Sequence, residues 1–68
     1  MYDLVLMAGS LPGVLGVLTV KARGLNCVCV AYTEDVRHVC RIFNVPYTHT
    51  FWNETGHKEA ADALRRML

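Results

Sequence analysis

The sequence predicts a three-layer, Rossmann-like α/β fold in which three parallel strands alternate with three helices, in the order β-α-β-α-β-α. Three apolar stretches have the length of strands, and each ends in small or polar residues that begin a helical pattern. The chain has 68 residues, which is room for one compact domain covering residues 1–68.

Right-handed crossovers between parallel strands limit the possible strand orders. The order 2-1-3 places helices on both faces of the sheet, whereas the order 1-2-3 leaves one face bare. Because the first two strands are apolar on both faces, we expect the order 2-1-3, or else a bare face that a second copy of the chain covers.

The first strand is predicted over residues 2–8 and the first helix over residues 11–22. Ser10 is suited to cap this helix and Pro12 to its first turn, and Gly24 is suited to a left-handed end. Apolar residues surround most of the helix axis, so we expect burial on more than one side.

The second strand is predicted over residues 26–32, with Thr33 as the cap of the next helix. That helix shows the spacing of a core-facing stripe, formed by Val36, Val39, Cys40 and Phe43. Asn44 and Pro46 end it.

The third strand is predicted over residues 47–52, and its more polar alternation indicates an edge position. Within it we expect Phe51 to pack against the last helix. A turn over residues 53–56 precedes this helix, predicted over residues 57–67, with Ala60, Ala61 and Leu64 facing inward.

Composition favours a protein partner. Apolar residues make up 53% of a chain too short to hide them all, so a homo-oligomer, with a dimer as the simplest case, or another protein partner is expected. The residues expected at this interface are Val14, Val17, Leu18 and Trp52.

Several partners and locations are disfavoured. A net charge of +1 from scattered basic residues gives no nucleic-acid footprint. The apolar segment over residues 4–20 is interrupted by Gly9, Pro12, Gly13 and Gly16, so no membrane span is expected. Three cysteines without a favourable pairing geometry indicate free thiols in a reducing, cytoplasmic location.

Ligands of open parallel sheets bind beyond the carboxyl ends of the strands, where three loops should meet. Small residues and helix N–H groups there could hold a nucleotide or another phosphate-containing ligand. The candidate binding residues are Gly9, Ser10, Gly13, Val14, Thr33, Glu34 and Asn53. The glycine spacing is not that of dinucleotide-binding motifs, and ordinary turn and cap chemistry also explains these residues.

No constellation specifies catalysis or metal binding. Ser10 follows a strand but lacks the Gly-x-Ser-x-Gly surroundings of a nucleophile, and the histidines and cysteines lack metal-ligand spacing. We therefore expect no metal, no cofactor apart from the nucleotide alternative, and a protein that is not an enzyme.

Two short stretches, Val-Ala-x-x-Glu-Asp from Val30 and Asn-Val-Pro-Tyr from Asn44, are similar to the strand-helix-strand segment of a family of RNA-binding ribosomal proteins. The resemblance implies RNA binding. The RNA-contacting Gly-x-Asn-Glu loop of that family is absent, and this chain begins with a strand in place of a helix. The leading expectation is therefore a small non-catalytic module that self-associates or binds a protein, with nucleotide binding second and RNA binding third.

Overall fold

The computed structural model describes residues 2–67 and confirms the alternation of strands and helices. The elements are β1 (Leu4–Ala8), α1 (Ser10–Ala22), β2 (Cys27–Ala31), α2 (Glu34–Ile42), β3 (Tyr47–His49) and α3 (Glu54–Met67). All three strands are parallel, with Ala8 paired to Ala31 and Ala31 to His49 at their carboxyl ends. The three carboxyl ends therefore meet at one edge of the sheet.

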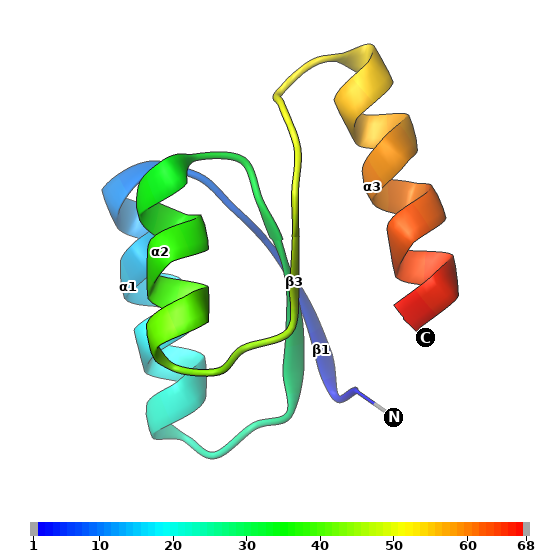
Figure 1. Cartoon of the computed structure of the whole chain (residues 1–68). Coiled ribbons are helices and arrows are strands. Elements are labelled where there is room, and N and C mark those ends of the chain that lie inside the picture. Colours follow the sequence, from blue (N-terminus) through cyan, green and yellow to red (C-terminus); the bar gives the residue numbers. More distant parts are fainter. Residues whose placement is uncertain (1, 68) are drawn as a thin grey trace.

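The strand order is β1-β2-β3, so the predicted order 2-1-3 is wrong. Two successive right-handed crossovers in the same direction place α1 and α2 on one face, and α3 alone lies on the other (Figure 1). Apolar residues on both faces of a strand are compatible with either order. In the observed order β2 is the central strand, and helices cover both of its faces (Figure 1).

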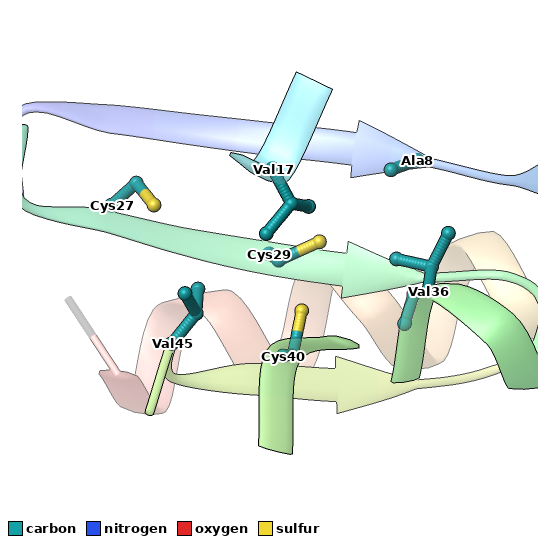
Figure 2. Close-up of a cluster of buried hydrophobic side chains, with 8 residues drawn as sticks. Ala8, Val17, Cys27, Cys29, Val36, Cys40 and Val45 are labelled. Atoms are coloured by element: carbon teal, nitrogen blue, oxygen red, sulfur yellow. The ribbon is translucent and has the colours of Figure 1, made fainter. Parts of the chain in front are cut away.

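The main core lies between the sheet and the layer formed by α1 and α2 (Figure 2). Cys29 of β2, Val17 of α1, and Val36 and Cys40 of α2 are completely buried there. The predicted stripe of α2 is confirmed at Val36 and Cys40, and Val39 is half-buried against the same cluster. Phe43 departs from it: the helix ends at Ile42, and Phe43 lies at the C-cap with 42% of its surface exposed.

A smaller core lies on the opposite face, under α3. Val30 and Tyr32 pack with Ala60, and Leu64 is half-buried beside them. Ala61, which we expected inside, is exposed, and Ala63 is buried instead. Ala60, Ala63 and Leu64 follow the i, i+3, i+4 spacing of one helix face, which does not include Ala61. The helix also begins earlier than predicted, at Glu54 in place of residue 57.

Chain reversals occur where the sequence indicated them. Gly24 has φ of 71° after α1, and Asn44 has φ of 57° after α2. The amino end of α1 differs from expectation, because Gly9 is the cap residue and Ser10 is the first helical residue, with φ of 60°. β3 is an edge strand as predicted.

Two glycines of α1 should respond oppositely to replacement by alanine. A Cβ atom at Gly13 would lie 2.9 Å from the Cβ of Ala8, whereas one at Gly16 would meet nothing within 4 Å. We expect Gly16→Ala to raise the free energy of unfolding by up to about 1 kcal/mol through helix propensity. Gly13→Ala should lower it by about 1–3 kcal/mol through overpacking. Urea denaturation followed by circular dichroism measures both, and a destabilising Gly16→Ala would contradict the open flank of α1.

Candidate functional site

The carboxyl edge of the sheet brings the loops after β1 and β2 into contact. The backbone N–H of Ser10 donates to Thr33 Oγ1 over 3.1 Å, and Thr33 Oγ1 in turn donates to Asp35 Oδ1. Thr33 occupies the cap position of α2 without making a side-chain cap bond. Its hydroxyl therefore joins the two loops instead of closing its own helix.

This arrangement occupies donors that an anion would need. Ser10 N–H is bound to Thr33, and Gly13 N–H donates to the Gly9 carbonyl over 3.3 Å, as in an ordinary helical turn. Pro12 has no N–H to offer. Gly13 and Val14, both candidate binding residues, belong to the regular turns of α1, which begins at Ser10.

Glu34 lies at the same edge but belongs to a different group of side chains. Its carboxylate pairs with Arg37 at 2.6 Å and approaches His49 Nε2 at 3.9 Å. The hydrogen bond from Arg37 holds the pKa of Glu34 below its usual value, and the hydrogen bond from Thr33 does the same for Asp35. Glu34 is thus paired with Arg37 and His49, whereas Ser10 is bound to Thr33, so the predicted ligand residues divide into two groups.

A third group is aromatic and lies toward α3. Trp52 packs edge-on against Tyr32, with ring centroids 4.9 Å apart, and against His57 at 4.8 Å. The Tyr32 hydroxyl is 3.1 Å from His57 Nδ1. Trp52 nevertheless keeps 74% of its surface exposed, so the cluster orients its ring without covering it.

The loop that carries Trp52 is closely fitted to α3. Asn53 Oδ1 caps the helix by accepting from Gly56 N–H over 2.7 Å, and the Thr50 hydroxyl donates to the Gly56 carbonyl over 3.2 Å. A Cβ atom at Gly56 would lie 1.9 Å from the Phe51 carbonyl oxygen. Asn53, predicted as a ligand residue, thus has a structural role, and Phe51 faces solvent beside His49 in place of the expected packing on α3.

The predicted interface residues of α1 are only partly available. Val17 is completely buried in the main core, and Val14 packs against that core, so neither offers a surface to a partner. Leu18 is half-buried, while its neighbours Leu11 and Leu15 are exposed. The helix is therefore apolar on two sides: its valines face the core, and Leu11 and Leu15 face solvent.

The sheet has an exposed apolar surface on β1, outside the residues predicted for the interface. Val5 and Met7 lie on the α3 face of β1, where they are 38% and 61% exposed, and we call these two side chains the β1 strip. Their partners in register, Val28 and Val30, are completely buried. The sequence does contain a pattern that predicts this strip: β1 is apolar on both faces, and in the order 1-2-3 one of these faces lacks its own helix.

The rest of the described surface offers a shallow hollow and no metal-binding cluster. A shallow hollow at the opposite, amino-terminal edge is lined by residues that include Arg41, Pro46 and Tyr47. Between residues 2 and 67, histidine, cysteine and acidic side chains form no group of three or more that could hold a metal ion. No helix within these residues combines the length and apolarity needed to cross a membrane.

Comparison with protein-family models, curated proteins and solved structures finds no match to this chain. At the carboxyl edge, His49 Nε2 lies 3.9 Å from the Glu34 carboxylate, and His57 Nδ1 lies 3.1 Å from the Tyr32 hydroxyl. A serine nucleophile needs a base within hydrogen-bond reach, and these two rings contact other residues, so the described side chains support no catalytic pair at Ser10.

We expect the Trp52 loop to depend on Gly56. Gly56→Ala should lower the free energy of unfolding by about 3 kcal/mol, because the added Cβ displaces the Phe51 carbonyl. The fluorescence of the single tryptophan should change as its ring leaves Tyr32. Thr55→Ala, at the exposed position next to buried Gly56, is the control, and equal stability of the two variants would contradict the close fit.

The buried thiols predict a loss of stability in alkali. Burial raises the pKa of Cys29 and of Cys40, so both stay protonated in the folded chain. The unfolded chain ionises its thiols from about pH 8.5, so the stabilisation from these groups is complete below that pH and decreases above it. Thermal unfolding from pH 7 to 10 measures this. If a double variant with Cys29→Ala and Cys40→Ala lost stability with rising pH as steeply as the unmodified chain, the thiols would not be the cause.

Proposed function

We propose that this chain is a small, non-catalytic α/β module of the cytoplasm that acts by binding a protein through exposed apolar surface. It would occupy a partner's surface, as adaptor and inhibitor proteins do, and not transform a substrate. The observation that carries the proposal is the exposure of the β1 strip next to fully buried residues of the same sheet face.

The contrast between Met7 and Val30 supports this proposal. The two residues are paired in register on one face, yet Met7 is exposed and Val30 is covered by α3. Complete burial of one such side chain is worth about 1.5–3 kcal/mol. A partner that covered the β1 strip would therefore gain a substantial part of the energy that holds a weak complex together.

The edge position of β1 adds a second reason. β1 pairs with β2 on one side, and its stretch from Leu4 to Ala8 contains no charge and no proline. Natural edge strands are usually protected by such residues or by a covering element. β1 is covered by α1 on one face only, which leaves the α3 face open to a partner (Figure 1).

The size of the chain gives a partner a further effect. A domain of this length has a net stability of only about 3–5 kcal/mol from a single core. A protein that binds the folded state alone adds to this stability, and the added stability rises with the logarithm of its concentration once that exceeds the dissociation constant. Association would thus serve both binding and the maintenance of the fold.

Nucleotide or phosphate binding at Gly9, Ser10, Gly13 and Glu34 stays a prediction with less support, because the first two loops use their donors on each other. A thermal-shift screen with mono- and dinucleotides tests it. A ligand at 100 times its dissociation constant adds about 2.7 kcal/mol. We expect no shift, and a reproducible shift with one phosphate compound would favour this second function.

Exposure of the β1 strip can be tested with an apolar dye whose fluorescence rises on contact with apolar surface. We expect the folded chain to bind the dye and Met7→Glu to weaken that binding, because a carboxylate would lie in the strip. Thr55→Glu adds the same charge to an exposed turn of α3 and should leave dye binding unchanged. Dye binding that is absent, or insensitive to Met7→Glu, would contradict the proposed surface.

A further inference from the structure

We propose that the protein which covers the β1 strip is a second copy of this chain, and that it docks with the outer side of α1. This inference rests on the proposed function and names its partner. Each copy carries a sheet surface that lacks a helix and a helix surface that lacks a sheet.

The helix surface consists of Leu11, Leu15 and Leu18, which we call the α1 stripe. Their spacing of four and three residues places them on one side of the helix. Leu11 is 65% exposed and Leu15 is 56% exposed, whereas Leu18 is half-buried. The inward side of the helix is formed by different residues, Val14, Val17 and Val20, which pack on the core.

The sheet surface is the β1 strip, on the face that carries only α3. Two helices, α1 and α2, cover one face of the sheet, while α3 packs over Val30 and Tyr32 and leaves β1 open (Figure 1). The side chains left uncovered on this face are Val5 and Met7, one strand away from those that α3 covers. An apolar helix from outside is the occupant that completes this layer.

Of the three helices, α1 has the side chains for that place. The outward positions of α3 include Lys58, Asp62 and Arg65, all exposed, and pressing them onto Val5 and Met7 would remove charges from water. The α1 stripe carries no charge. A helix that is apolar on two sides can pack on its own sheet and on that of a neighbour at the same time.

Charges at the ends of the two surfaces also match. In this fold helices run antiparallel to the strands on which they pack (Figure 1). An α1 helix that lay on the strip in this way would place its last turn, with Lys21 and then Arg23, near the amino end of β1. Asp3 is exposed there, just before the strand. The opposite orientation would lose this attraction.

The two surfaces lie on opposite faces of one sheet, so a copy cannot cover its own strip with its own stripe. Contact between unlike surfaces is heterologous, and it produces rings or open chains of copies in place of a closed two-fold dimer. The expected assembly therefore grows with concentration beyond two copies.

Two variants separate the surfaces. Leu15→Glu removes the α1 stripe and keeps the β1 strip, whereas Met7→Glu does the reverse. By sedimentation velocity, the unmodified chain should show a mass that rises with concentration, and each variant alone should associate at least tenfold more weakly. An equimolar mixture should give a complex of two copies and nothing larger, because one intact stripe meets one intact strip. Thr55→Glu serves as the control and should assemble like the unmodified chain.

Three outcomes would overturn the inference: an unmodified chain that stays monomeric, single variants that assemble normally, or a mixture that gives no two-copy complex. Circular dichroism of each variant establishes that it is folded before mixing. Dye binding is to be measured at a concentration low enough to keep the copies apart, because association would cover the strip. A chain that stays monomeric at every concentration and whose strip binds the dye would overturn self-association alone. Loss of dye binding as well would overturn the proposed function.

Discussion

All five residues of β2 are buried, so this strand must be covered on both faces and paired along both edges. The sheet meets this requirement by placing β2 between β1 and β3, with α1 and α2 on one face and α3 on the other. Burial of an apolar strand is the dominant stabilising term in a chain this small. The positions of the other elements follow from it.

The same constraint explains why β1 is left partly open. Three helices cannot cover two faces of a three-stranded sheet equally, and α3 packs over Val30 and Tyr32 of the central strand region, where burial removes most apolar surface. Val5 and Met7, one strand away, are then the residues left in contact with water. The surface that we propose for association is thus a consequence of how the core is filled.

At the carboxyl edge, contacts within the protein weaken the case for the anion-binding site that the sequence predicts. Gly9, Ser10 and Gly13 have the residue types of an anion site, but the Ser10 N–H is satisfied by Thr33, and Gly13 makes a close contact with Ala8. Glu34 turns toward Arg37 and His49. Each of these residues thus has a structural partner. Thr33, Ala8 and His49 lie on another loop or element, so spacing could not reveal them, whereas Arg37 is three residues after Glu34 on the same helix.

The sequence by itself determined which segments are strands and helices, since hydrophobic periodicity, capping residues and the stops at Gly24 and Asn44 are local signals. It also determined that three thiols are buried and free. The tertiary structure alone decided the strand order, the inward direction of Val17 and the outward direction of Leu15, and the exposure of Phe43 and Phe51. An apolar side chain is equally suited to a core and to an interface, and only the placement of its neighbours decides which of the two it joins.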